Sequence, residues 1–279
     1  YYFKGEFHGK PFRLQNVQQR WVGKAFDELL EADQLQLQDS VLRATIIQQL
    51  DPADDSSIHH IFERLNTGGV NLNPMEIRRC LYEGSLLDLL IRLNNDDYWR
   101  IILGQGKPDR RMRDVELLVR FYAFHYFMSD YTGDLKGMLD LACGRLNTRW
   151  AEEEAALRQL GQEFEEAYIA SKEVFGEKTV FRKWGQDRYE SRFKRSIFDV
   201  VMHYFAQPHV RQAALANREG VEEQFKKLCS GDQAFLGSIE KTTKSLEATY
   251  IRFSKWAVAL NEVLGTSIHV PALENGRIA

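Results

Sequence analysis

The amino-acid sequence predicts a mainly α protein, in which a small mixed α/β part precedes a multi-helix bundle. Two observations predict this fold class. Apolar residues recur at the 3.6-residue period of a helix in almost every segment after residue 57. Before them, the run LRATIIQQL at 42–50 is short, rich in β-branched residues and followed by a polar cluster, as a strand would be. We therefore expect one domain at 1–84, a helical domain at 85–265 and a tail at 266–279.

The first domain carries both kinds of pattern. Apolar residues between Trp21 and Leu30 have roughly helical spacing, and 42–50 is the strand candidate. The cluster DPADDSS at 51–57 offers several helix N-caps, and Gly68 is a plausible stop for the helix that follows it. The apolar face of that helix consists of Ile58, Ile61, Phe62 and Leu65.

A further helix is predicted to begin at Pro74. Asn73 is a good N-cap, proline is favoured at the first helical position, and Glu76 is the acidic partner of a capping box. Gly84 is expected to end this helix, and the seam between the two domains lies near it.

The rest of the chain is predicted to be helical. Its aromatic stripes are assigned to the core, because rings at this spacing usually pack against neighbouring helices. They are Phe121, Phe124, Tyr126 and Phe127 in one helix, and Phe193, Phe198 and Phe205 in another. The expected helices are 86–93, 97–103, 114–128, 135–146, 151–175, 189–205, 218–229 and 238–264. The closing stretch SIHVPALENGRIA is expected to be poorly anchored.

Composition restricts the classes of partner and compartment. The formal charge is −3, so a surface for nucleic acid would have to be a local patch. The three cysteines are widely spaced and odd in number, which argues against a disulfide framework or a zinc site and favours a reducing cytoplasm. No apolar run approaches the roughly 20 residues that span a bilayer. The sequence begins at Tyr1 within an aromatic stretch, and we expect further sequence upstream.

The loop within IFERLNTGGVNLNPMEI, residues 61–77, is richer in glycine and amide residues than a helix connection needs. Gly68 and Gly69 can adopt positive φ, and free amides there and at the start of the next helix would form an anion cradle. Arginines flank it on both helices and could supply bidentate contacts to a phosphate. The candidate phosphate ligands are Arg64, Thr67, Gly68, Gly69, Asn73, Arg78 and Arg79. The alternative is a well-capped helix–loop–helix with solvated arginines.

Two further segments concentrate positive charge. In GKPDRRMRDVELLVRF (106–121), Arg110, Arg111 and Arg113 lie where the dipole of the following helix disfavours cations, which hints at an anionic partner. The alternative is a surface salt-bridged by neighbouring acids.

The second segment, FRKWGQDRYESRFKRS (181–196), interleaves cations with aromatic residues. This pattern suits a nucleic-acid surface and equally describes an ordinary amphipathic helix. The cations of the segment are Arg182, Lys183, Arg188, Arg192, Lys194 and Arg195, of which we select the first three as nucleic-acid ligands.

Other chemistry has little support in the sequence. The adjacent His59 and His60 face different ways on a helix, and no His or Glu spacing supports a metal site. His125 and His203 lie in aromatic helical contexts, where we expect core or boundary residues. Cys80 has Arg79 beside it, but no base is identified to activate it as a nucleophile.

The run IFERLNTGGVNLNPMEIR resembles the hallmark segment of a large prokaryotic family with a ParB/sulfiredoxin-like N-terminal domain. That family includes the GmrS half of the GmrSD modification-dependent restriction systems. The family's Phe-x-x-x-Asn motif matches Phe62 and Asn66, and its Gly-Gly-x-x-Leu-Asn continuation matches 68–73. The resemblance covers roughly residues 1–130, including the RMRDVELLVRF segment.

The resemblance implies a C-terminal portion of an anti-phage or restriction-type protein that binds or hydrolyses nucleotide and senses or acts on DNA. It implies a place near the active site for Phe62 and Asn66. A nucleoside triphosphate with Mg²⁺ is the implied cofactor, and a nuclease subunit or second chain is the implied partner. The family's Asp-Gly-Gln-Gln-Arg box is absent from these residues, so the chain is expected to be catalytically incomplete. The alternative is a non-catalytic helical protein-interaction module.

Overall fold

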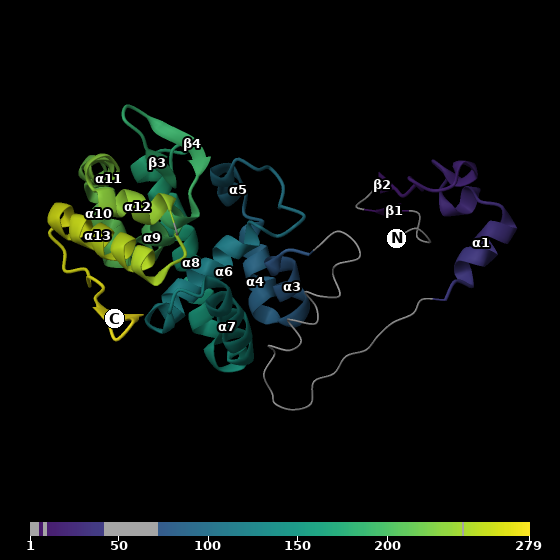
Figure 1. Ribbon diagram of the computed structural model, residues 1–279, viewed down its shortest axis with the longest axis horizontal. Coiled ribbons are helices and arrows are strands. Elements are labelled where there is room, and N and C mark those ends of the chain that lie inside the picture. Colours follow the sequence, from purple (N-terminus) through teal and green to yellow (C-terminus); the bar gives the residue numbers. More distant parts are fainter. Residues whose placement is uncertain (1–5, 8–9, 42–71, 242) are drawn as a thin grey trace. The chain divides into compact units, whose positions relative to one another are not determined.

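The computed structural model describes residues 6–7, 10–41, 72–241 and 243–279. The chain divides into two compact units, Tyr1–Ile58 and His59–Ala279 (Figure 1). The predicted strand at 42–50 lies outside the described residues. None of the described helices is both long and apolar enough to cross a membrane. The two units are described separately below.

The described part of the first unit is small. It contains a two-stranded hairpin, short 3₁₀ turns and one α-helix that has no buried residue. Its interior is formed around Ala25 and Leu29, and the guanidinium of Arg13 pairs with Glu28 at 2.6 Å. The elements are β1 Glu6–Phe7, β2 Lys10–Pro11, η2 Gln19–Trp21, η3 Phe26–Glu28 and α1 Glu31–Gln38.

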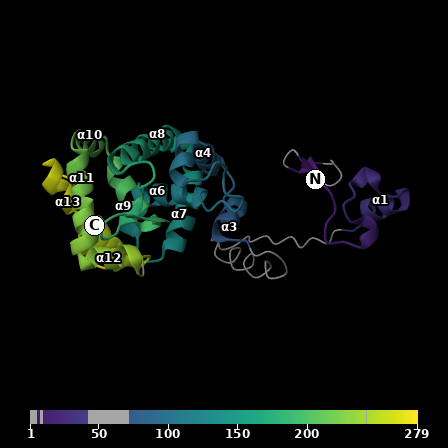
Figure 2. The same cartoon turned by 90° about the horizontal axis from the view of Figure 1, so that it is seen from above.

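The second unit is a helical bundle with small hairpins, which confirms the mainly α prediction. Figure 2 shows α10 to α13 gathered at one end of this unit and α3 and α4 toward the other. The elements of its first half are α3 Pro74–Leu81, α4 Ser85–Asn94, α5 Asp97–Leu103, α6 Val115–Phe127, η5 Met128–Asp130, α7 Leu135–Thr148 and α8 Trp150–Phe175. The others are β3 Arg182–Trp184, β4 Tyr189–Phe193, α9 Arg195–Phe205, α10 Pro208–Ala216, α11 Arg218–Gly231, α12 Gln233–Glu240, α13 Leu246–Leu264, β5 Leu273–Glu274 and β6 Arg277–Ile278.

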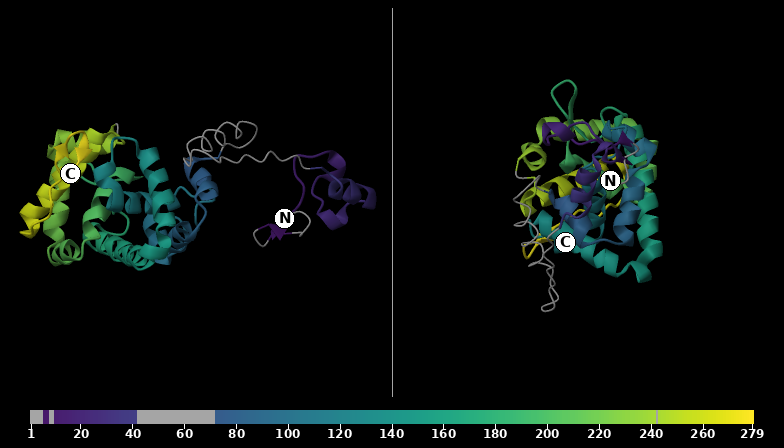
Figure 3. Two further views of the ribbon diagram at one scale, coloured as in Figure 1. Left: turned by 90° about the horizontal axis from the view of Figure 1, so that it is seen from below. Right: turned by 90° about the vertical axis from the view of Figure 1, so that its right-hand side faces the viewer.

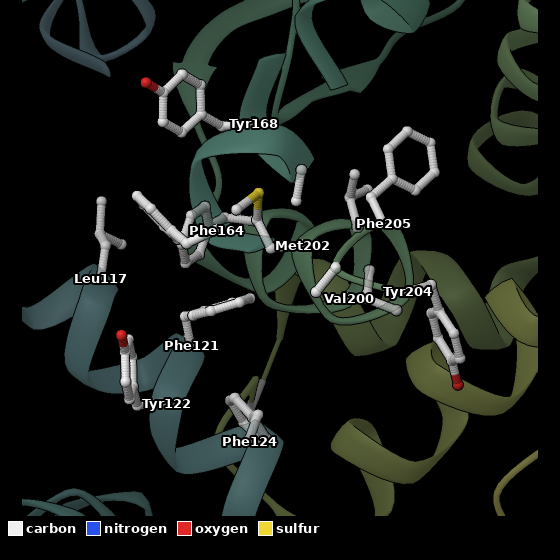
Figure 4. Close-up of a cluster of buried hydrophobic side chains, with 14 of the residues drawn as sticks. Leu117, Phe121, Tyr122, Phe124, Phe164, Tyr168, Val200, Met202, Tyr204 and Phe205 are labelled. Carbon is white, nitrogen blue, oxygen red and sulfur yellow. The ribbon is translucent and has the colours of Figure 1, made fainter. Parts of the chain in front are cut away.

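The core of the helical unit forms where α6, α8 and α9 meet. Phe121 of α6 contacts Phe164 of α8 edge to face, with 5.2 Å between ring centroids, and both rings are buried. Figure 4 shows these side chains together with those of α9, of which Val200 and Met202 are fully buried. The predicted aromatic stripes are thus confirmed as core, except that Tyr126 and Phe193 are only partly buried.

A buried charge cluster joins α6, α9 and α13. The carboxylate of Asp199 on α9 accepts hydrogen bonds from the guanidinium of Arg120 on α6, one of them from Nε at 2.9 Å. Arg252 on α13 lies 3.7 Å from the same carboxylate and donates to the Thr243 carbonyl at 2.9 Å. Two buried cations therefore share one buried anion, and this cluster fixes α13 and the segment before it against α6 and α9.

Three sequence expectations about the helical unit are wrong. Residues 189–193 form a strand, β4, that pairs antiparallel with β3, and a helix begins only at Arg195. The helix expected at 238–264 is two helices, because α12 ends at Glu240 and α13 starts at Leu246 after an N-cap by Ser245. The closing stretch is anchored: β5 and β6 pair as a hairpin, and Ile268 and Ile278 are buried.

The expected stop at Gly84 also has a different role. The preceding helix α3 already ends at Leu81, and Gly84 is the N-cap residue of α4. Asn147 of α7 reaches this position, where its amide accepts from Leu86 N at 3.3 Å and donates to the Glu83 carbonyl at 3.1 Å. A side chain from another helix therefore caps α4, and only a residue without a Cβ leaves room for it.

Candidate nucleic-acid interface

The predicted phosphate site is described only at its C-terminal end, the start of α3. Asn73 caps this helix as expected: its side-chain oxygen accepts from Met75 N at 2.8 Å and from Glu76 N at 3.0 Å. Its amide nitrogen donates to the Arg111 carbonyl at 2.6 Å, and Glu76 completes the capping box. The side chain of Asn73 is therefore engaged inside the protein.

The two arginines of α3 are also engaged. Arg78 is buried, and its Nε donates to Asp140 of α7 at 2.7 Å while Glu116 of α6 lies 3.7 Å away. Arg79 pairs with Asp88 of α4 at 3.1 Å. These contacts tie α3 to three neighbouring helices. The remaining predicted ligands, Phe62, Arg64, Asn66, Thr67, Gly68 and Gly69, lie outside the described residues.

The three arginines of the loop before α6 have different surroundings. Met112 has a φ of 55°, a left-handed conformation that is uncommon for a residue with a side chain. On one side of it, Arg111 contacts Glu76 of the α3 capping box at 3.1 Å. On the other side, Nε of Arg113 donates to Asp109 at 2.6 Å, while Arg110 is exposed. This loop therefore connects the start of α3 with the surface beside α6.

The hairpin that replaces the expected helix projects from the bundle (Figure 3) and uses two of its predicted ligands internally. Arg182 donates to the carbonyls of Ser191 at 3.1 Å and Val180 at 2.9 Å. Lys183 lies between Glu190 at 2.7 Å and Glu240 at 2.6 Å, and these carboxylates raise the pKa of its ammonium. The third predicted ligand, Arg188, is exposed in the turn.

A cavity of about 540 Å³ brings the two basic segments together. Arg113, from the loop before α6, lines one side. Arg192, Lys194 and Arg195, from the end of β4 and the start of α9, line another. We call this the basic cavity. Residues about 80 positions apart in the sequence thus meet at one site, and these are the cations that it contains among the described residues.

The arginines of the basic cavity are more exposed than its acids. The side chains of Arg113 and Arg195 are 64% and 50% exposed, whereas those of Asp109 and Asp114 are 12% and 4% exposed. The third acid in the lining, Glu240, is 35% exposed and pairs with Lys183 at 2.6 Å. Burial alone would raise the pKa of Asp114, but hydrogen bonds from the Asp109 amide and from Arg100 hold it below its usual value. Asp114 is therefore ionised, and the buried guanidinium of Arg100 balances its charge. A ligand arriving from solvent meets guanidinium groups first.

The N-terminus of α9 opens at the same place. Lys194 occupies the N-cap position without a side-chain cap, and the first turn contains no acidic residue. Cations at this end of a helix oppose the macrodipole by roughly 0.3–1 kcal/mol each, whereas an anion is stabilised there. Glu190 lies 3.5 Å from Lys194 and Glu116 lies 3.9 Å from Arg195, and these carboxylates partly offset the two cations. A bound anion would stabilise them further.

Sequence reasoning identified both basic segments but selected partly different ligands from the second. Arg182 and Lys183 are structural clamps, while Arg192, Lys194 and Arg195 line the cavity. The sequence signal for these ligands is a helix that begins at Arg195 with cations and without an acidic residue in its first turn. The predicted helix began at Tyr189, so this start was not recognised.

Comparison of the chain with protein-family models, with curated proteins and with solved structures finds no match.

Proposed function

We propose that the helical unit binds the phosphate backbone of nucleic acid in the basic cavity. The observation that supports this is the meeting of exposed Arg113, Arg192 and Arg195 at one cavity in which Asp109 and Asp114 are recessed and Glu240 is paired with Lys183. Guanidinium groups are well matched to phosphate oxygens, which they hold by paired hydrogen bonds. The local positive surface is what a chain with a net charge of −3 needs in order to attract a polyanion.

The existing ion pairs at the cavity do not prevent such binding. Arg113 and Asp109 form an i,i+4 pair in which the arginine is largely exposed, and pairs of this kind contribute only about 0–1 kcal/mol. The contact between Arg195 and Glu116 is long, at 3.9 Å. Arg192 has no partner among the described residues. Phosphate oxygens can therefore compete for these groups at little cost.

The wider setting that we propose is a restriction or phage-defence protein, with a nuclease subunit or second chain as its partner. The resemblance of residues 61–78 to the ParB/sulfiredoxin-like family supports this setting. Binding or hydrolysis of a nucleoside triphosphate with Mg²⁺ at Phe62 and Asn66 stays a prediction, because those residues lie outside the described part of the chain.

The test compares two double variants that change the net charge equally. Arg113→Gln with Arg195→Gln removes two cations from the cavity. Arg92→Gln with Arg145→Gln removes two exposed cations that do not line it. Binding of the full chain to fluorescently labelled DNA, single-stranded and duplex, is measured by anisotropy at low salt. Because each lost hydrogen bond to a charged group costs on the order of 1 kcal/mol, we expect the cavity variant to bind about tenfold or more weakly and the control to change little.

Equal loss of affinity in the two double variants would mean that binding follows net charge and does not use the cavity. Absence of binding by the unaltered chain to both forms of DNA would overturn the proposal outright. Circular dichroism of each variant checks that the helices are retained.

A second candidate function is the non-catalytic protein-interaction module. The observation that favours it is that Asn73, Arg78 and Arg79 are all used in contacts within the protein. In this case the start of α3 is a structural cap, and the helices form a docking surface. The same titration separates the candidates, because a docking module does not require DNA affinity that depends on Arg113 and Arg195.

A further inference from the structure

A second cavity shares one lining residue with the basic cavity. It has a volume of about 640 Å³ and is lined by Lys178, by Arg188 in the β3–β4 turn and by β4 as far as Arg192. We call it the hairpin cavity. The shared residue is Arg192, so the two cavities meet at the end of β4.

The cations of the hairpin cavity are available to a ligand. Lys178, Arg188 and Arg192 are exposed, and none of the three side chains has a partner among the described residues. Of the two acids in the lining, Glu190 is already paired with Lys183 at 2.7 Å, which holds its pKa below the usual value. Asp187 is the exposed acid. The net charge that the hairpin cavity presents to solvent is therefore positive, like that of the basic cavity.

The aromatic residues of the hairpin are not available for stacking on bases. Phe193 packs edge to face against Phe181 at 5.6 Å between centroids, and the Tyr189 hydroxyl donates to Glu222 at 2.9 Å. Trp184 is partly buried and lies 4.6 Å below the ammonium of Lys226. A ligand in these cavities is therefore held by its phosphates, so base identity contributes little.

We infer that the two cavities form one continuous track for a single strand of nucleic acid, with Arg192 at its midpoint. This inference rests on the proposed function and specifies its ligand. A flexible single strand can place successive phosphates in both cavities, whereas the phosphates of a duplex are held at fixed positions on a convex surface. We therefore expect a single strand to contact the cations of both cavities and a duplex to contact fewer of them. A mononucleotide would occupy one cavity and leave the cations of the other unused.

The test uses variants that separate the two halves of the track. Arg188→Gln with Lys178→Gln alters only the hairpin cavity, and Arg113→Gln with Arg195→Gln alters only the basic cavity. Affinity for a homopolymeric single strand of about 15 nucleotides, for a mixed-sequence strand and for a duplex of equal length is measured across a salt series. Arg92→Gln with Arg145→Gln is again the control of equal charge.

For the single strand, we expect both cavity variants to bind about tenfold more weakly and to lose about 0.7 of a unit of the log–log salt slope per phosphate contact removed. The unaltered chain is expected to bind the homopolymer and the mixed sequence alike, and the duplex several-fold more weakly. If the hairpin-cavity variant binds like the control while the basic-cavity variant is weakened, the track is wrong and the proposed function stands. Equal or tighter binding of the duplex also overturns the track. If neither variant differs from the control, both proposals fail.

Discussion

Asp199 and Arg192 represent the two ways in which this chain uses charge. Asp199 is buried between Arg120 and Arg252, where it joins three helices. Removing one partner of such a cluster usually costs several kcal/mol, because the others remain buried without compensation. Arg192 is exposed and unpaired among the described residues, so its charge contributes little to folding. Asp199 therefore contributes to the stability of the fold, whereas the charge of Arg192 is available to bind a ligand.

His203 makes the stability of the helical unit sensitive to acid. Burial, and to a lesser degree the neighbouring His125, lower the pKa of its imidazole to about 3. The folded protein therefore holds His203 neutral, while the unfolded chain binds a proton near the usual pKa of 6.5. Its contribution to stability is complete above pH 6.5 and is lost as the pH falls toward 3. We expect the uptake of this proton by the unfolded chain to lower the free energy of unfolding at pH 4 by up to about 3 kcal/mol relative to neutral pH.

The measurement is urea unfolding of the full chain between pH 7 and pH 4. His203→Gln removes the titrating group, so its stability should fall less steeply with acidification than that of the unaltered chain. His209→Gln, on the exposed surface of α10, is the matched control and should leave the pH dependence unchanged. A parallel pH dependence of His203→Gln and the unaltered chain would contradict the assignment. His125 and His269 line a cavity of about 290 Å³ together with His203, and both are kept in every variant.

The partners of Arg78 and Arg79 could not be predicted from the sequence. Both were reasonable phosphate ligands, because they lie one turn into a helix whose start could face an anion. Their partners Asp140 and Asp88 come from α7 and α4, and sequence spacing does not reveal which acid will face which arginine. In contrast, the role of Asn73 as an N-cap was predictable, because the capping box is local to residues 73–76.

At the scale of elements, the junction of α3, α4 and α7 depends on Gly84. Its φ of 161° is an extended conformation that any residue adopts, so backbone strain does not require glycine. The requirement is steric, because a Cβ would lie 2.2 Å from the amide nitrogen of Asn147. Gly84→Ala should therefore expel the Asn147 cap and lower the free energy of unfolding by about 1–2 kcal/mol.

A double-mutant cycle tests this mechanism by denaturant unfolding. In an Asn147→Ala background, Gly84→Ala should have little further effect, because the clashing amide is absent. Gly106→Ala is the control, since a Cβ at that position meets no atom within 4 Å. An effect of Gly84→Ala that is equally large in both backgrounds would rule out Asn147 as the cause.

Most helices of the described second unit were predictable, because their apolar periodicity is long and their caps are local. The error at 189–205 has a physical reason. Apolar residues at 189 and 193 are four apart, which fits one face of a helix and equally fits alternate positions of a strand. Pairing with β3 decides in favour of the strand, and that is a tertiary contact. The same error hid the start of α9, and with it the cations of the basic cavity.

At the scale of the whole molecule, the predicted domains and the observed units differ in the place that they give to α3. The sequence assigns this helix to the first domain, and in the structure it contacts α7 of the helical unit. Asn73 and Glu76 contact Arg111, so the start of α3 and the loop of the basic cavity form one assembly. The start of α3 is thus joined to the loop that carries Arg113 of the proposed nucleic-acid interface.

The salt dependence of single-stranded DNA binding by the unaltered chain tests the central claim most directly. Anisotropy titrations over a range of monovalent salt give the slope of log affinity against log salt, which reports how many phosphates the protein neutralises. If the cations of the two cavities engage about four to six phosphates, the slope should be about −3 to −4. A slope near zero, or no measurable binding at low salt, would contradict the account.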